Sequence, residues 1–208
     1  MPLFKTIIFD KITKVLVWKI TESIDDLKIN IALTEKNKLR FNGMKSELHQ
    51  RGFLSVRHLL KEAGYSDFDL FYDKFGKPFL KDGKHISITH SFTFSGIIIS
   101  KQTPVGIDIE KQRDKIVKIA PKFTPITKYK SLANYNTLVR KLTVVWGAKE
   151  SLYKIYGKKK LLFLHHIYID DFLLDDKNTT GEIQFNGTTT PYQINFLEFE
   201  GFTCVYAF

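Results

Sequence analysis

The chain has 208 residues and carries 32 lysine and arginine residues against 22 aspartate and glutamate residues, a net charge of +10. A hydrophobic fraction of 43% and a charged fraction of 26% are typical of a folded globular protein and exclude disordered, collagen-like and fibrous classes. The longest apolar runs are far shorter than the roughly 20 residues that a bilayer-spanning helix needs, and Cys204, the single cysteine, excludes an internal disulfide and a multi-cysteine metal site.

The first half of the chain is expected to place helices between short strands. Thr34 and Ser46 are candidate N-caps for helices over about 35–63, and Gly64 is the expected stop. Apolar and alternating segments predict strands at residues 6–9, 15–20, 68–71, 85–89 and 96–100.

The second half repeats this outline. Helical spacing over 138–156 precedes Gly157, and Asn186-Gly187 is a hairpin signal. Strands are predicted at residues 105–109, 163–170, 181–185, 191–199 and 202–207. The repeated order suggests two α+β halves with a boundary near Thr103-Pro104.

The positive charge is concentrated in one part of the chain. Residues 111–160 hold 14 basic side chains and two acidic ones, whereas residues 161–208 hold one lysine and seven acids. An excess of this kind indicates an anionic partner, such as a phosphorylated ligand, an acidic protein, a membrane surface or nucleic acid. Only five of the basic residues are arginine, the residue favoured for reading base edges, which argues against sequence-specific DNA binding.

Two carboxylates lie two residues apart on the strand predicted at 105–109. Asp108 and Glu110 therefore project from one face, opposite Ile107 and Ile109. Close carboxylates repel unless a proton or cation lies between them, and Mg²⁺ prefers carboxylate and phosphate oxygens. The spacing alone is equally compatible with a solvent-facing strand that carries ordinary acids.

A second pattern lies on the helix predicted at 138–156. Trp146, Glu150 and Lys154 are spaced i, i+4 and i+8 and form one stripe, with Lys149 at its flank. Glu150 and Lys154 alone are compatible with a surface ion pair. A tryptophan on the same stripe favours a partly buried cleft that binds phosphate.

Three further signals are weak when taken singly. His90 and Ser91 of Thr89-His90-Ser91 can both donate to a phosphate oxygen, although a lone histidine after a strand is more often structural. Gly76-Lys77-Pro78 is a turn that presents one lysine. Arg51 and Arg57 lie six residues apart on the predicted helix and do not share a face.

Taken in order, these motifs resemble the 4′-phosphopantetheinyl transferases of the Sfp (surfactin-synthetase-activating) type. The resemblance covers roughly residues 40–165. It is carried by Gly76-Lys77-Pro78, Thr89-His90-Ser91, Gly106-Ile107-Asp108-Ile109-Glu110 and Trp146-x-x-Lys149-Glu150-x-x-x-Lys154. It implies a pseudo-dimeric α+β fold with an N-terminal half, 1–104, on the adenosine side of coenzyme A. The C-terminal half, 105–208, would hold the metal and pyrophosphate, with the active site in the cleft between the halves.

The resemblance also implies an activity and a set of site residues. Enzymes of this type, which include holo-acyl-carrier-protein synthases, move 4′-phosphopantetheine from coenzyme A to a serine of a carrier protein and release adenosine 3′,5′-bisphosphate. By analogy, the metal ligands for Mg²⁺ are Asp108, Glu110 and Glu150. Glu150 is the general base, with Asp108 and Lys154 as further catalytic residues. The implied ligands of the coenzyme A phosphates are Arg51, Lys77, His90, Lys149 and Lys154, and Arg57 is not assigned.

The chain departs from the family pattern in three places. Thr89 replaces a serine and keeps the hydroxyl. No acid stands in 123–128, where members carry Phe-x-x-x-Glu, and only Gly157 remains of a Gly-x-Gly-Leu motif that is followed here by three lysines at 158–160. None of these changes removes an implied metal ligand.

The partner expected from the charge and the resemblance is an acidic apo carrier protein, steered by the basic stretch 111–160. A fatty-acid carrier and the carrier domains of polyketide or peptide synthetases all remain open, as does Mn²⁺ in place of Mg²⁺. The alternatives are a non-catalytic module of the same fold that binds coenzyme A or a carrier and, last, a nucleic-acid-binding protein. We expect a cytoplasmic protein without membrane association, because residues 1–5 show no signal-peptide pattern and the apolar runs are short. The resemblance implies a monomer, since the family fold needs one chain, and a dimer stays open.

Overall fold

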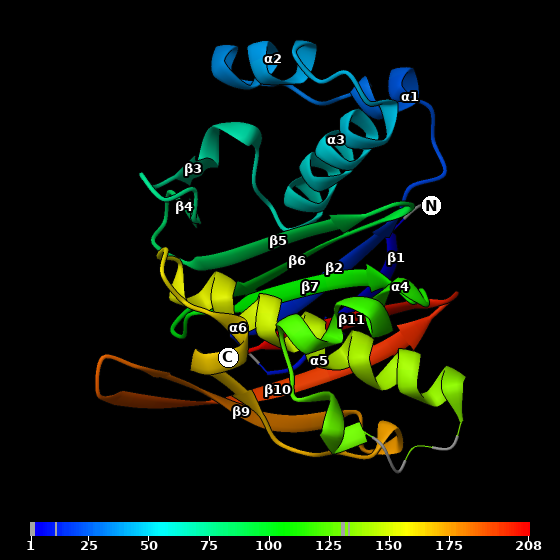
Figure 1. Cartoon of the computed structure of the whole chain (residues 1–208). Coiled ribbons are helices and arrows are strands. Elements are labelled where there is room, and N and C mark those ends of the chain that lie inside the picture. Colours follow the sequence, from blue (N-terminus) through cyan, green and yellow to red (C-terminus); the bar gives the residue numbers. More distant parts are fainter. Residues whose placement is uncertain (1–2, 11, 130–131, 133) are drawn as a thin grey trace. The chain divides into compact units, whose positions relative to one another are not determined.

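The computed structural model describes residues 3–10, 12–129, 132 and 134–208 (Figure 1). Met1 and Pro2, which open the segment inspected for a signal peptide, and Lys130 of the basic stretch lie outside the described residues. The chain divides into two compact units, Met1–Pro104 and Val105–Phe208. Each unit joins helices to an antiparallel sheet, so the predicted α+β class is confirmed.

Unit 1 is built on a six-stranded sheet in the order β1-β2-β6-β5-β4-β3. Neighbouring strands of this sheet pair antiparallel within the described part of the chain. The strands are β1 (Leu3–Ile8), β2 (Thr13–Lys19), β3 (Leu70–Tyr72), β4 (Pro78–Leu80), β5 (His85–Ser91) and β6 (Phe94–Ser100).

The helices of unit 1 are α1 (Ile24–Lys28), α2 (Glu35–Asn42) and α3 (Glu47–Glu62). Thr34 caps α2 by accepting a hydrogen bond from the Asn37 N–H, as its residue type predicts. Gly43 ends α2, so the region predicted as helical over 35–63 is two helices. The α3 helix packs on β2, β5 and β6 and buries Leu54, Leu59 and Leu60 in the core of unit 1.

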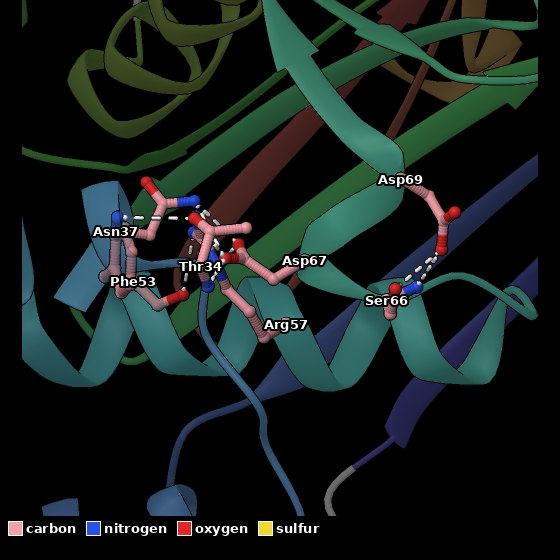
Figure 2. Close-up of polar contacts among 7 residues, drawn as sticks. All are labelled: Thr34, Asn37, Phe53, Arg57, Ser66, Asp67 and Asp69. Carbon is pink, nitrogen blue, oxygen red and sulfur yellow. Dashed lines mark hydrogen bonds and ion pairs between the residues drawn. The ribbon is translucent and has the colours of Figure 1, made fainter.

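A buried ionic network joins three segments of unit 1 (Figure 2). Arg57 on α3 is 4% exposed and donates from Nε to Asp67 Oδ1 at 2.9 Å. The other oxygen of Asp67 accepts from the Thr34 N–H at 2.9 Å, and Asn37 Nδ2 donates to both oxygens. The Arg57 guanidinium also lies 3.5 Å from the centre of the Phe53 ring. Arg57, unassigned from the sequence, therefore fixes the start of α2 against α3.

Unit 2 holds a five-stranded sheet in the order β7-β11-β10-β9-β8. Its strands are β7 (Gly106–Lys111), β8 (Ile167–Ile169), β9 (Asn178–Phe185), β10 (Thr188–Phe199) and β11 (Phe202–Ala207). Its helices are α4 (Lys115–Ile119), α5 (Tyr135–Tyr156) and α6 (Phe163–His166). The α5 helix packs on β7, β8, β10 and β11. Gly157 ends α5 with a φ of 66°, and Asn186-Gly187 turns β9 into β10, both as predicted.

Two strand predictions are wrong in their first halves. Residues 68–71 were expected to be extended, but Asp67–Asp69 forms a turn of 3-10 helix and the strand runs over Leu70–Tyr72. Residues 163–170 were expected to be extended, but Phe163–His166 forms α6 and only Ile167–Ile169 is strand. The apolar run at 161–164 carries no helical period, and contacts with α5 and His166 decide its conformation. His166 Nδ1 accepts from the Leu162 N–H at 2.9 Å and closes the turn.

None of the helices in the described part of the chain combines the length and the apolar composition that crossing a bilayer requires.

Candidate active site

The helix α5 approaches the sheet of unit 2 closely at two glycines. A Cβ on Gly106 of β7 would lie 2.0 Å from the main-chain oxygen of Ser151 on α5. A Cβ on Gly147 of α5 would lie 2.7 Å from Val205 Cγ2 on β11. Both contacts require the absence of a side chain. They bring the face of β7 that carries Asp108 directly under α5, since the Gly147 position is 3.8 Å from Asp108 Oδ2.

Three carboxylates lie on two elements that pack together: Asp108 and Glu110 on β7, and Glu150 on α5. Asp108 is 5% exposed, and Glu110 and Glu150 are partly buried. Burial, followed by the negative charge of Asp108, raises the pKa of both Glu110 and Glu150 to about 7. These side chains therefore lie within electrostatic reach of one another, as their positions on the predicted strand and helix indicated.

Lys154 supplies a cation to this cluster. Its ammonium donates to Asp108 Oδ1 at 2.8 Å and to the Ile107 carbonyl at 2.7 Å. Among the described residues, no three or more His, Cys, Asp or Glu side chains converge as a ready-made metal cluster. The donor set nevertheless fits a hard divalent cation, because carboxylate oxygens are ligands that Mg²⁺ prefers and a positive charge would relieve the repulsion that Asp108 exerts on Glu110 and Glu150.

Lys149 is placed differently from the phosphate ligand that the resemblance implied. Its side chain is 3% exposed, and its amine donates to the carbonyls of Phe163, at 2.6 Å, and Ile167. Burial, with a smaller contribution from the charge of Lys128, lowers the pKa of Lys149 to about 7. Because Lys149 is three residues from Trp146 and five from Lys154, it faces α6, whereas Lys154 faces β7.

The tryptophan of the predicted stripe is part of an aromatic cluster. The ring centre of Trp146 lies 5.1 Å from that of Phe123 and 5.4 Å from that of Phe163. Phe163 in turn lies 5.6 Å from Tyr153. The tryptophan is partly buried, as expected, and its neighbours are aromatic side chains from outside α5.

A small cavity of about 150 Å³ adjoins the carboxylates within unit 2. Its lining includes Glu110 and Trp146, and Ile116 and Ile119 of α4 contribute apolar surface. Lys111, Arg113 and Lys115 add three positive charges at the same cavity. The sequence indicated the basic stretch but not this cavity.

Unit 1 holds a second cavity, of about 340 Å³, at α2, α3, β3 and β5. Its lining includes His90, as the resemblance suggested for a phosphate-binding residue, together with Arg40 and His49. His90 packs on Gly52 of α3, where a Cβ would lie 3.1 Å from its ring. Arg40 and His49 were missed from the sequence. A signal existed for His49, because it lies at helical spacing from Phe53 and Val56, which line the same cavity.

Lys77 and Arg51 do not line this second cavity. Lys77 stands in the turn between β3 and β4, where Asp73 Oδ1 accepts from the Lys77 N–H at 2.9 Å and Gly76 has a φ of 88°. Burial lowers the pKa of Lys77, against the opposing charge of Asp73. Arg51 Nη2 donates to the Ile20 carbonyl at 3.2 Å. Arg51, Lys77 and His90 thus all belong to unit 1, and of the three only His90 lines this cavity.

An α+β unit that carries buried carboxylates, a paired lysine and an adjoining basic cavity has the composition of a site for an anionic substrate and a divalent cation. A model of the 4′-phosphopantetheinyl transferase superfamily matches residues 104–207, which are half of the chain, so the chain belongs to this superfamily. The 4′-phosphopantetheinyl transferase gsp of Aneurinibacillus migulanus is similar, with 33% identity over 135 residues. That alignment covers 64% of this chain and 54% of the relative, so the chain spans about half the length of the curated relative that it matches.

Proposed function

We propose that this protein transfers 4′-phosphopantetheine from coenzyme A to a serine hydroxyl of an apo carrier protein. The observation that carries the proposal is the meeting of Asp108, Glu110 and Glu150 with Lys154 at β7 and α5, in a chain of this superfamily. Neither a nucleic-acid-binding function nor a solvent-facing strand accounts for three acids gathered and partly buried in the most basic part of the chain.

In the proposed reaction, the serine Oγ attacks the phosphorus that bears the pantetheine arm. The bond from that phosphorus to the bridging oxygen breaks, and adenosine 3′,5′-bisphosphate leaves with the bridging oxygen. The proton of the serine passes to the carboxylate of Glu150, which we assign as the general base. Lys154 stabilises the negative charge on the phosphate oxygens.

We assign Mg²⁺ to Asp108, Glu110 and Glu150. When bound, the ion would neutralise charge on the pyrophosphate and on the leaving group. The carboxylates themselves supply oxygen ligands and hold a negative potential that attracts the ion. Because Lys154 bonds to Oδ1 of Asp108, the second carboxylate oxygen, Oδ2, is the atom that we assign to the ion.

Unit 1 is proposed to hold the 3′-phosphate of coenzyme A. His90, Arg40 and His49 line one cavity and offer several N–H donors, and Lys77 stands in the nearby β3–β4 turn of the same unit. The stacked arrangement of Arg40 with Phe53 and Tyr72, at 5.7 and 5.9 Å from the ring centres, orients its guanidinium in this cavity. The location of coenzyme A between the two halves stays a prediction.

The carrier is proposed to approach the basic cavity beside Glu110. Lys111, Arg113 and Lys115 would attract acidic side chains of the carrier, and the wall formed by Ile116 and Ile119 offers an apolar contact. The segment 123–128, which lacks the acid of the family pattern, packs inward at Phe123 and Thr124, both buried. The segment therefore supplies buried side chains to unit 2 and does not supply a carboxylate to the proposed acceptor site.

Intact-mass measurement of a carrier tests the proposal directly. The protein would be incubated with coenzyme A, Mg²⁺ and several apo carrier proteins, and each carrier would be weighed. We expect one phosphopantetheine added per carrier, no addition with EDTA, and no addition by a folded Glu150→Gln variant. Coenzyme A binding without mass gain on any carrier would instead support the non-catalytic module.

A further inference from the structure

The short helix α6 is attached to α5 by one buried amine. Lys149 donates to the carbonyls of Phe163 and Ile167, which stand at the first residue of α6 and at its C-cap. A one-turn helix has too few residues to satisfy its own carbonyls, and a cationic donor near its C-terminal end is favourable. The Lys149 amine thus supplies hydrogen-bond donors for carbonyls that have no donor within α6 itself.

A ring contact holds the same helix from a second point. Phe163 lies 5.4 Å from Trp146 and 5.6 Å from Tyr153, between ring centres. Trp146, Lys149 and Tyr153 are at positions i, i+3 and i+7 of α5 and therefore share one face. Leu161, 6% exposed, adds a buried apolar anchor just before α6.

These anchors fix both ends of the loop that carries the three lysines at 158–160. The loop leaves α5 at Gly157, which accepts the left-handed conformation and bonds back to the Tyr153 carbonyl at 3.0 Å. Only four residues later the chain reaches Leu161, whose side chain is buried in the core of unit 2. Lys158, Lys159 and Lys160 are all exposed, so their backbone is held at both ends while their charges point to solvent.

We propose that Lys149 is a positioning residue that holds residues 161–167 against α5. By doing so it determines where the lysines at 158–160 present their charge to the carrier. Lys149 does not bind the phosphates of coenzyme A. This proposal rests on the proposed transferase function for the role of the carrier. The separation from the phosphates follows from the geometry alone, because the amine is 3% exposed and points at two carbonyls.

Reductive methylation of the unmodified protein, read by peptide mass spectrometry, distinguishes the two roles of Lys149 without any substitution. We expect Lys149 to resist methylation both without coenzyme A and with coenzyme A and Mg²⁺. Ready methylation that coenzyme A suppresses would show that the amine faces the phosphates and would overturn the proposal.

Lys149→Met, with Lys141→Met as its matched control, tests the positioning role. Lys141 is also a buried lysine of α5, but its amine bonds to the carboxylate of Asp171. For Lys149→Met we expect faster amide hydrogen exchange at 158–167, a carrier KM raised about tenfold, and a coenzyme A Kd within about twofold of wild type. Lys141→Met should lower thermal stability without the faster exchange at 158–167 and without the rise in carrier KM.

Other outcomes are decisive as well. A coenzyme A Kd raised more than about tenfold in Lys149→Met would make Lys149 a phosphate ligand. Faster exchange with an unchanged carrier KM would make it a purely structural lysine, and unchanged exchange would show that it does not hold the segment; each result contradicts the proposal. Should Lys149→Met fail to fold, Phe163→Leu loosens the same segment and must give the same exchange and KM changes. If no carrier is ever modified, the transferase proposal fails, but methylation, exchange and coenzyme A binding still decide the placement of Lys149.

Discussion

At the scale of the residue, several ionisable side chains have pKa values that their surroundings shift away from the ordinary values. Glu110 and Glu150 are held as weak acids by burial and by Asp108, and Lys149 as a weak base by burial. In unit 1, burial alone would raise the pKa of Asp67, but hydrogen bonds from Thr34 and Asn37 and the charge of Arg57 lower it below its usual value. The Asp67 carboxylate thus belongs to a hydrogen-bonded structural network, whereas Asp108 repels the other two carboxylates of unit 2.

Glu150→Gln should stabilise the metal-free protein at high pH. The folded-state pKa of Glu150, about 7, exceeds the unfolded value of about 4.3, so the folded protein holds a proton that unfolding releases and stability falls as pH rises through this window. Glutamine mimics the protonated acid. In EDTA, urea unfolding should give equal stabilities near pH 4 and a more stable variant at pH 8.

The divalent ion supplies the control for this prediction. Mg²⁺ should stabilise the wild-type protein at pH 8 and reduce or reverse the advantage of the variant. A variant that is no more stable than wild type at pH 8 in EDTA would show that Glu150 is not held in a repulsive cluster.

Arg40 should contribute to recognition of the 3′-phosphate. Arg40→Gln removes a cation from the cavity that His90 and His49 line, so it should weaken coenzyme A more than 3′-dephospho-coenzyme A, by about 1.5–3 kcal/mol for a hydrogen bond to a charged group. Isothermal titration calorimetry with both ligands measures the difference. Arg113→Gln, at the cavity of unit 2, is the control that should affect both ligands alike.

At the scale of the element, the site depends on how closely α5 lies on the sheet. Gly106 and Gly147 let α5 approach the sheet more closely than a residue with a side chain at either position would allow. The sequence indicated the two elements and the faces of their acids, because periods of 2 and 3.6 residues follow from backbone geometry. It did not indicate that α6 replaces strand at 163–166, because that outcome depends on Lys149, fourteen residues away from Phe163.

Gly106→Ala should destabilise the protein by at least about 2 kcal/mol, because its Cβ would lie 2.0 Å from a main-chain oxygen that cannot yield without moving α5. Urea unfolding measures the loss. Gly43→Ala is the matched control: its φ is −78°, its nearest contact would be 3.4 Å, and it should change stability by no more than about 0.5 kcal/mol. Similar effects at the two positions would contradict the close approach.

At the scale of the whole molecule, charge is separated along the chain. The positive excess of 111–160 lies in the same unit as the carboxylates, and residues 161–208 are net acidic. Composition and motif order were sufficient to predict the class, the family and the positions of the acids. The cavity partners Arg40 and His49 could not be predicted in the same way, because they come from different helices and meet only after α2 and α3 fold onto β5.

Neutralising the lysines at 158–160 should weaken carrier recognition selectively. The triple change Lys158→Gln, Lys159→Gln and Lys160→Asn uses asparagine at 160 because that residue has a φ of 95°. We expect the carrier KM to rise several-fold and to depend less on salt, with the coenzyme A KM little changed.

An equal loss of charge elsewhere tests whether position matters. Replacing the exposed lysines Lys45, Lys61 and Lys101 of unit 1 with glutamine also removes three charges. The same increase in carrier KM in both triple variants would assign the effect to net charge and not to the loop.

The sheet order of unit 2 has a consequence for synthesis of the chain. Within the described strands, β7, which carries Asp108 and Glu110, pairs only with β11, although about 90 residues separate them along the sequence. The ribosome therefore synthesises Asp108 and Glu110 long before β11, the strand that pairs with theirs. A nascent chain that still lacks Phe202–Ala207 cannot assemble its acids, so any cation-dependent activity should arise only once that segment has left the ribosome.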